Sequence, residues 1–172
     1  MSNDLKFKIS HKVTGDNSSN FTIKPLDRGY GITIGNSLRR ALLTAVPGAA
    51  ITNVKIEGAH HEFSTIDGVT EDVADFIMNL KGVRFHLFES KVEPIFLKVK
   101  GPNAFTAADI QAVSDDFTIL NPDHHITDIA KGTILEVELR LGIGKGYKSS
   151  EENELNNSPV GMIPIDSIFN PV

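Results

Sequence analysis

Hydrophobic and polar residues alternate over several short stretches of the chain, a pattern typical of strands with one buried face. Leu5, Phe7 and Ile9 alternate with lysines, and a predicted loop over residues 14–20 separates them from a second strand that starts with Phe21 and Ile23. Residues 61–65 are also predicted to be extended. The remaining alternating positions predict four more strands: Thr52-Val54-Ile56, Val83-Phe85-Leu87, Ile95-Leu97-Val99 and Leu135-Val137-Leu139-Leu141.

A helical period replaces the alternation over residues 34–46, directly after a glycine-rich turn. Gly29 and Gly31 give that turn access to backbone angles that other residues avoid, and Pro47 with Gly48 ends the helix. At about 100° per residue, one broad stripe of the helix is apolar and is predicted to be a core or packing face. Its members are Ile34, Leu38, Ala41, Leu42, Ala45 and Val46.

The opposite side of this helix carries Asn36, Arg39, Arg40 and Leu43 as neighbours, at spacings of three and four. A leucine between two arginines suggests a second packing surface, because the flat guanidinium group suits paired contacts at interfaces. A solvated helix face with one stray leucine is the alternative that this geometry leaves open.

A second helix is predicted after Asp67, which we expect to be its N-cap. Glu71 and Asp72 favour the positive start of this helix, and Lys81 with Gly82 ends it. Its predicted buried stripe consists of Val69, Val73, Phe76, Ile77 and Leu80. Residues 142–157 are predicted to be a loop. These elements together indicate an α+β fold with a mainly antiparallel sheet and helices on one side.

Composition narrows the class of protein. The 172 residues are 40% hydrophobic, enough for a real core, and the net charge of −5 argues against a broad surface for nucleic acid. The sequence has no cysteine, which excludes disulfides and thiolate metal sites and fits a reducing cytoplasm. We expect no signal peptide, because residues 1–10 contain no apolar run, and no membrane helix.

The sequence offers little catalytic chemistry. Residues 142–146 resemble a phosphate-binding loop, but no helical period follows them, so we expect a strand-end loop. The histidine pairs 60–61 and 124–125 cannot each share one metal in a strand, because neighbouring side chains point to opposite faces. The acidic pairs 115–116 and 151–152 lie in loop-like segments and are expected to be solvated. We therefore predict no catalytic residue and no metal site.

Several motifs closely resemble the N-terminal domain of the bacterial RNA polymerase α subunit. Leu26-Asp27-Arg28-Gly29-Tyr30-Gly31 is followed by Gly35-Asn36-Ser37-Leu38-Arg39-Arg40 and Pro47-Gly48. The resemblance continues in collinear order through His61-Glu62-Phe63-Ser64-Thr65, Gly68-Val69, Glu71-Asp72, Asn79-Leu80-Lys81-Gly82, Pro159-Val160-Gly161 and Ile165-Asp166-Ser167-Ile168-Phe169-Asn170-Pro171-Val172. It therefore covers nearly the whole chain.

This resemblance implies a domain order. Residues 1–47 would be the first part of a dimerisation and assembly domain that contains the hairpin and the first helix. Residues 48–170 would be an insert domain, and residues 171–172 would begin the return into the dimerisation domain. The remainder of that domain, with its partner helix, and the family's C-terminal DNA-binding domain would be missing from this chain.

The resemblance also implies a role as a non-catalytic scaffold of DNA-directed RNA polymerase, a nucleotidyltransferase. The expected partners are a second α subunit, through Ile34, Leu38, Ala41, Leu42 and Ala45, and the β subunit, through Asn36, Arg39, Arg40 and Leu43. The β′ subunit would meet Asp75, Lys81, Ile165 and Asp166. We expect no cofactor on this chain, with the Mg²⁺ and Zn²⁺ of the complete enzyme on other subunits, and no direct DNA binding. A free-standing binding or regulatory module with the same fold is the alternative function.

Overall fold

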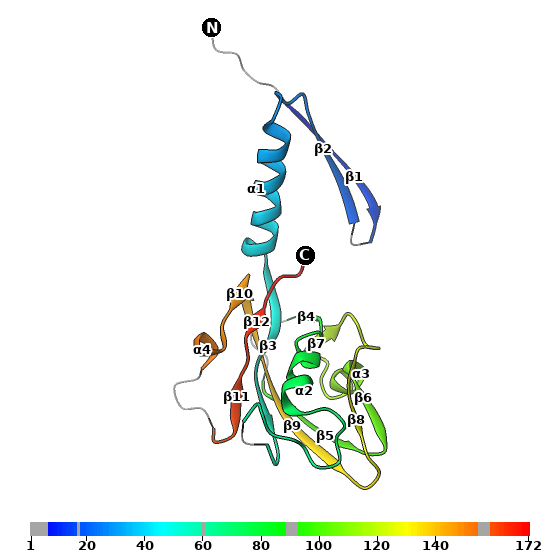
Figure 1. Cartoon of the computed structure of the whole chain (residues 1–172). Coiled ribbons are helices and arrows are strands. Elements are labelled where there is room, and N and C mark those ends of the chain that lie inside the picture. The colour runs from blue at the N-terminus through cyan, green and yellow to red at the C-terminus, as the bar shows by residue number, and fades with distance from the viewer. Residues whose placement is uncertain (1–6, 17, 60, 89–92, 155–158) are drawn as a thin grey trace. The chain divides into compact units, whose positions relative to one another are not determined.

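The computed structural model describes residues 7–16, 18–59, 61–88, 93–154 and 159–172. The chain forms two compact units that divide between Leu42 and Leu43. The first unit contains an antiparallel hairpin of β1 (Lys8–Gly15) and β2 (Ser18–Lys24), followed by helix α1 (Tyr30–Ala45), whose last residues belong to the second unit (Figure 1). The predicted hairpin and helix are thereby confirmed.

The structure corrects the predicted bounds of the hairpin and of the first helix. The loop predicted for residues 14–20 is mostly strand, because Val13 pairs with Ser19 and the Thr14 hydroxyl lies 2.9 Å from the Ser18 hydroxyl. Gly31 lies inside α1 rather than in the preceding turn. Leu5, which was predicted to be in the first strand, lies outside the described residues.

A mainly antiparallel sheet dominates the second unit, with strand order β5-β9-β3-β4-β7 and β11 added beside β3. Every strand pair in the described ranges is antiparallel. The strands are β3 (Pro47–Ile56), β4 (Phe85–Leu87), β5 (Ile95–Lys100), β6 (Asn103–Thr106), β7 (Phe117–Ile119), β8 (His125–Ile129), β9 (Ile134–Lys145), β10 (Tyr147–Lys148), β11 (Met162–Pro164) and β12 (Ser167–Ile168). The helices are α2 (Val73–Leu80), α3 (Ala107–Gln111) and α4 (Ser150–Asn153). The α+β class is confirmed.

The core of the second unit lies between the inner face of this sheet and the apolar stripe of α2. Val73, Phe76, Ile77 and Leu80 are buried, as their helical spacing predicts. The ring of Phe76 stacks with that of Phe105 at a centroid separation of 6.2 Å. Segments far apart in the sequence therefore share one hydrophobic cluster.

Strand β3 is longer than predicted and contains a bulge. It begins at Pro47, where a proline is tolerated because the position starts the strand. Its register against β9 shifts between Ile51 and Asn53, so the alternation predicted for this stretch is wrong on one side of the bulge. Asn53 was predicted to lie on the polar outer side, yet it is only 1% exposed.

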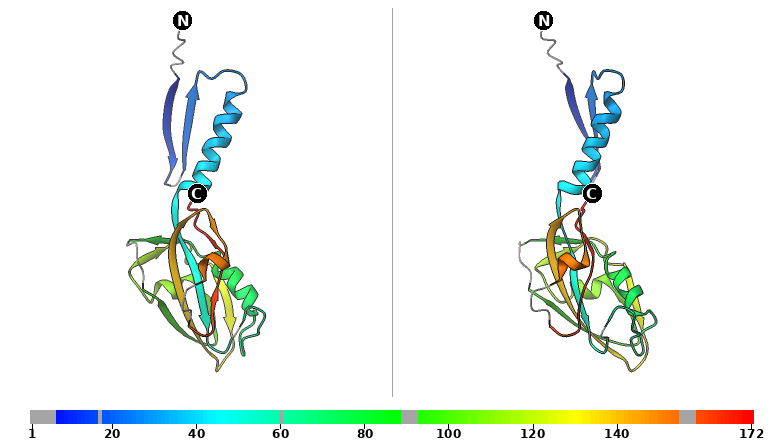
Figure 2. Two further views of the ribbon diagram at one scale, coloured as in Figure 1. Left: turned by 90° about the vertical axis from the view of Figure 1, so that its left-hand side faces the viewer. Right: turned by 60° about the vertical axis from the view of Figure 1, so that its left-hand side comes forward.

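Asn53 is buried because α4 covers the outer face of the sheet at this point. Its side-chain amide donates to the backbone oxygen of Asn153 at 3.0 Å. Val54, the next residue, points to the opposite face and joins the core. The prediction that all helices lie on one side of the sheet is therefore wrong, because α4 lies across β3 from α2 (Figure 1). Figure 2 shows α4 in orange and the red strands β11 and β12 beside β3, and β11 pairs with β3.

Four further predictions about the second unit need correction. Residues 61–65 form turns rather than a strand. Helix α2 begins at Val73, and its N-cap is Asp72 rather than Asp67. The Asp72 carboxylate accepts a hydrogen bond from the Asp75 amide at 2.8 Å. Val69 forms an isolated bridge with Ile129 instead of a helical turn. Residues 142–145 continue β9, because they pair with the glycine- and alanine-rich start of β3.

The sequence reasoning assigned no element to residues 103–129, where the structure has β6, α3, β7 and β8. These elements are only three to five residues long, too short for a hydrophobic period to stand out.

In the described ranges no helix combines the length and the apolar character that crossing a membrane demands.

Candidate protein-interaction surfaces

Helix α1 is introduced by a tight turn. The amide of Tyr30 donates to the Asp27 carbonyl at 3.1 Å, and Gly29 between them has φ of +93°, which favours glycine strongly over other residues. The turn starts the helix at Tyr30, so that Ile34 and Leu38 fall on one side and Asn36 on the other.

The apolar stripe of α1 has no cover within the described part of the chain. None of the helix residues is buried. Leu38 is 49% exposed and Leu42 is 46% exposed, Ala41 and Ala45 are exposed, and Ile34 is half-buried. Because a 16-residue helix depends on tertiary packing for most of its stability, such a stripe indicates a surface for another polypeptide.

The arginine side of α1 is accessible as well. Asn36, Arg39 and Arg40 are exposed, and Leu43 is half-buried. The sequence reasoning missed Ile32, which is 75% exposed and lies on this same side, four residues before Asn36 and seven before Arg39. Extending the helical period one turn towards the N-terminus would have found it. Together, Ile32, Asn36, Arg39, Arg40 and Leu43 form what we call the arginine face.

The surface predicted from Asp75, Lys81, Ile165 and Asp166 is only partly a surface. Lys81 Nζ lies 2.7 Å from both carboxylate oxygens of Asp166, so these two side chains bind each other. Asp75 is exposed near the start of α2. Ile165 is 3% exposed and belongs to the hydrophobic core, so its side chain is not available to a partner. A partner at this surface would therefore meet a paired lysine and aspartate.

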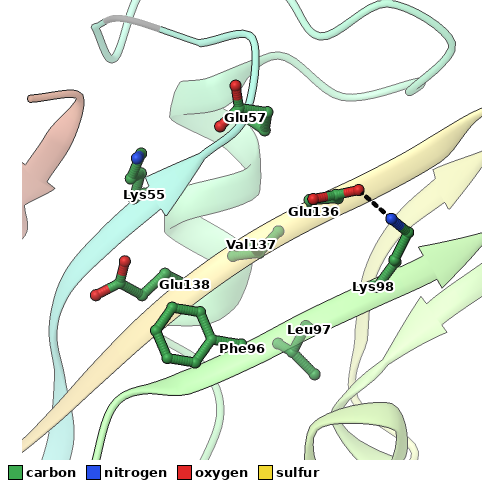
Figure 3. Close-up of a pocket in the computed structure, with 8 residues that line it drawn as sticks. All are labelled: Lys55, Glu57, Phe96, Leu97, Lys98, Glu136, Val137 and Glu138. Carbon is green, nitrogen blue, oxygen red and sulfur yellow. Dashed lines mark hydrogen bonds and ion pairs between the residues drawn. The ribbon is translucent and has the colours of Figure 1, made fainter.

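A shallow depression of about 320 Å³ lies on the outer face of the sheet, over β3, β9 and β5 (Figure 3). Phe96, which is 67% exposed, lies beside Glu138, and Lys98 pairs with Glu136 (Figure 3). Leu97 and Val137 alternate with these residues and are buried on the inner face. Charges of both signs line the depression, so its electrostatics favour neither an anion nor a cation.

A polar cluster joins the approach to α2 with strand β8. The Glu71 carboxylate accepts hydrogen bonds from the Thr127 hydroxyl and, at 3.1 Å, from the Asp128 amide. Partial burial acts to raise the pKa of Glu71, but these hydrogen bonds and the nearby His125 outweigh it, so the pKa lies below its usual value. Glu71, His125 and Asp128 hold their ligand atoms within 4.8 Å of one another.

The two histidines of the pair 124–125 point to different surroundings, although only His125 belongs to strand β8. His124 Nε2 lies 2.8 Å from the Asn79 carbonyl at the end of α2, whereas His125 Nε2 lies 3.4 Å from Asp128 Oδ1. His60 is outside the described residues, so the other pair cannot be compared. Sequence reasoning missed the grouping of His125 with Glu71, because no spacing rule relates residues so far apart in the chain.

The acidic pairs considered for catalysis do not converge on a metal site. Asp115 and Asp116 are exposed, as are Glu151 and Glu152. The Glu152 carboxylate accepts from the Ser149 amide in a capping box at the start of α4. Asp116 likewise accepts from the Ser114 hydroxyl at 2.9 Å, so one residue of each pair makes a local turn or helix contact.

These surfaces define a class of protein: an α+β domain whose first helix has packing faces without a buried residue. The family model described as "RNA polymerase Rpb3/RpoA insert domain" matches residues 54–170, and the chain belongs to this family. Three curated relatives of the chain are each named "DNA-directed RNA polymerase subunit alpha". The resemblance seen in the sequence is thereby confirmed.

Three relatives show the extent of this similarity. The protein of Salinibacter ruber is 52% identical over 91% of this chain and 48% of its own length. Those of Chloroherpeton thalassium and Limosilactobacillus reuteri are 44% and 48% identical over 97% and 94% of this chain, and over 51% and 52% of their own lengths. The chain thus spans about half the length of the relatives it matches. None of these names favours the free-standing module considered as an alternative.

Proposed function

We propose that the chain acts as the N-terminal half of an RNA polymerase α subunit, a non-catalytic scaffold that dimerises and nucleates assembly with β and β′ for transcription. The observation that carries the proposal is α1, a helix of 16 residues without a single buried side chain. Its exposed stripe and its arginine face are suited to two different protein partners at once.

The apolar stripe would pair with a second α subunit. Leu38 and Leu42 are about half exposed, and Ile34, Ala41 and Ala45 continue the same side. Small and branched side chains at this spacing allow close helix packing, and removing their apolar surface from water favours association.

The arginine face would bind the β subunit. Arg39 and Arg40 supply planar donors that suit carboxylates or backbone carbonyls, and Leu43 with Ile32 supplies apolar area beside them. A few arginine and apolar residues of this kind dominate the energetics of many interfaces. The exposure of Arg40 supports this assignment.

The β′ subunit would meet the surface formed by Asp75, Lys81 and Asp166. Catalysis, with its metal ions, would belong to other subunits, because polymerase chemistry needs converging carboxylates. The net charge of −5 supports a role without direct DNA contact, and the absence of cysteine supports a place in the cytoplasm.

Replacing Arg40 by alanine tests the proposed β surface. We expect Arg40→Ala to reduce retention of purified β subunit in a pull-down by about tenfold or more, because an anchor residue would be lost while the exposed position leaves the fold intact. Circular dichroism would check the fold.

Two further variants sharpen this experiment. Arg40→Lys keeps the charge but not the planar fork, so it should also bind β weakly. Lys131→Ala removes an exposed cation from a turn of the second unit and should bind as the unchanged chain does. Full retention of β by Arg40→Ala would disprove the assignment of this face.

A further inference from the structure

The cluster of Glu71, His125 and Asp128 has no part in the surfaces assigned to α, β or β′. It combines two carboxylates and an imidazole, whose ligand atoms lie within 4.8 Å of one another. His125 and Asp128 come from β8, and Glu71 lies just before the N-cap of α2. The cluster therefore joins two elements that are distant in the sequence.

A bulge turns two of these side chains to the same side. In a regular strand, residues three apart point to opposite faces. Here Thr106 pairs with His125 and Phe105 with Thr127, which leaves Ile126 as an extra residue. As a result, the side chains of His125 and Asp128 are 46% and 58% exposed on one side of β8, while Ile126 is buried.

The separation of these two side chains suits a shared metal ion. His125 Nε2 lies 3.4 Å from Asp128 Oδ1. Ligands bound to Zn²⁺ at about 2.0–2.2 Å in a tetrahedral arrangement lie roughly 3.4 Å from each other. The two ligand atoms are therefore already spaced as neighbouring ligands would be.

Glu71 is held in place by groups that would not themselves bind the ion. Thr127, which is fully buried, donates its hydroxyl to Glu71 Oε2, and the Asp128 amide donates to the same oxygen. Hydrogen bonds of this kind orient metal ligands and maintain their affinity. The two carboxylates bring negative charge to the cluster that a divalent cation would neutralise.

We propose that Glu71, His125 and Asp128 bind a divalent first-row transition ion, with water completing the coordination shell. The imidazole favours Zn²⁺ or a related ion over Mg²⁺ and Ca²⁺, which prefer shells of oxygen alone. The bound ion would link segments 57 positions apart in the chain and hold the start of α2 against β8.

A calorimetric titration of the metal-free, full 172-residue chain with Zn²⁺ at pH 7.5 tests this site. We expect one saturable site formed by these ligands. Excess Mg²⁺ should not block the binding of Zn²⁺ to it. His125→Gln and Asp128→Asn should each weaken binding by about tenfold or more, because each removes one ligand. Added Zn²⁺ should raise the thermal midpoint of the unchanged chain but not that of His125→Gln.

His86→Gln is the matched control. His86 is exposed on β4, with its ring against that of Phe88 at 5.6 Å, and it lies outside the cluster. Its variant should keep the full affinity for Zn²⁺. The proposal is overturned if the chain shows no saturable binding, if His125→Gln and Asp128→Asn bind as the unchanged chain does, or if His86→Gln loses as much affinity as they do.

Discussion

Three buried polar residues connect the C-terminal segment to the sheet. Asn53, Asn153 and Ser167 are between 1% and 4% exposed. The Asn153 amide donates to the Ile165 carbonyl at 2.8 Å and to the Ser167 hydroxyl at 3.0 Å, and Ser167 donates to the Ile51 carbonyl at 2.7 Å. Asn53 on β3 donates to α4, Asn153 on α4 donates to Ser167 of β12, and Ser167 donates back to β3, so the network fixes α4 and β12 against β3.

Removing the Asn153 amide tests the network. Asn153→Ala would remove the shorter hydrogen bond to the Ile165 carbonyl in a buried site and leave it only the Ser167 hydroxyl at 3.3 Å, while the backbone oxygen that Asn53 contacts remains. We expect the free energy of unfolding to fall by about 1–3 kcal/mol, measured by urea denaturation. Glu151→Ala, at an exposed position of the same helix, should change it little. Equal stabilities of the two variants would contradict the role of the network.

At the scale of elements, glycines allow β3 and β9 to approach Phe169, whose backbone carbonyl lies over Gly48 and whose ring lies over Gly144. Gly48 pairs with Gly144, and Phe169, which is 2% exposed, lies against both. A Cβ atom at Gly144 would lie 2.6 Å from Phe169 Cδ2, too close for the ring to stay where it is. These glycines are therefore needed for strand packing and not for the binding of phosphate.

Gly144→Ala should consequently destabilise the second unit. We expect its free energy of unfolding to fall by about 1–3 kcal/mol, since the added methyl group forces Phe169 or β9 to shift. Thermal and urea denaturation would measure the change. Gly35→Ala adds a methyl group that meets nothing within 4 Å, so the unfolding of the second unit should not change. An unchanged stability of Gly144→Ala would show that the ring is not packed as described.

At the scale of the whole molecule, the two units differ in how well each can bury its own hydrophobic residues. The second unit has a core of interlocking strands and helices. In the first unit, no described residue is buried, and Phe21, Ile32 and Leu38 are among its exposed apolar residues. A unit of this kind gains little hydrophobic stabilisation from its own packing, and under the proposed function partner subunits would supply the missing burial.

Charged residues in the apolar stripe test whether this surface drives self-association. We expect the unchanged chain to associate with increasing concentration in analytical ultracentrifugation, and Leu38→Lys/Leu42→Lys to remain monomeric, because burying two lysines at a dimer interface is costly. Ile32→Lys changes a more exposed apolar residue on the arginine face and should still associate. A monomeric unchanged chain, or a double variant that still associates, would contradict pairing through the stripe.

The sequence by itself determined the features that depend on neighbouring residues. Helical spacing placed Leu38 and Arg40 on opposite sides of α1 and predicted the buried stripe of α2, and alternation located β5 and β9. Local motifs also led to the family, since they are read residue by residue. These inferences hold because backbone periodicity is a property of short segments.

The tertiary structure alone decided which polar residues are buried and which side chains meet. The cover from α4 buries Asn53 on the outer face of the sheet, where its local pattern predicts an exposed side chain. The bulge in β8 brings His125 to Asp128, and the chain path brings Glu71 to both. Such contacts depend on the register of strands that pair across long stretches of chain, and no short segment of sequence encodes that register.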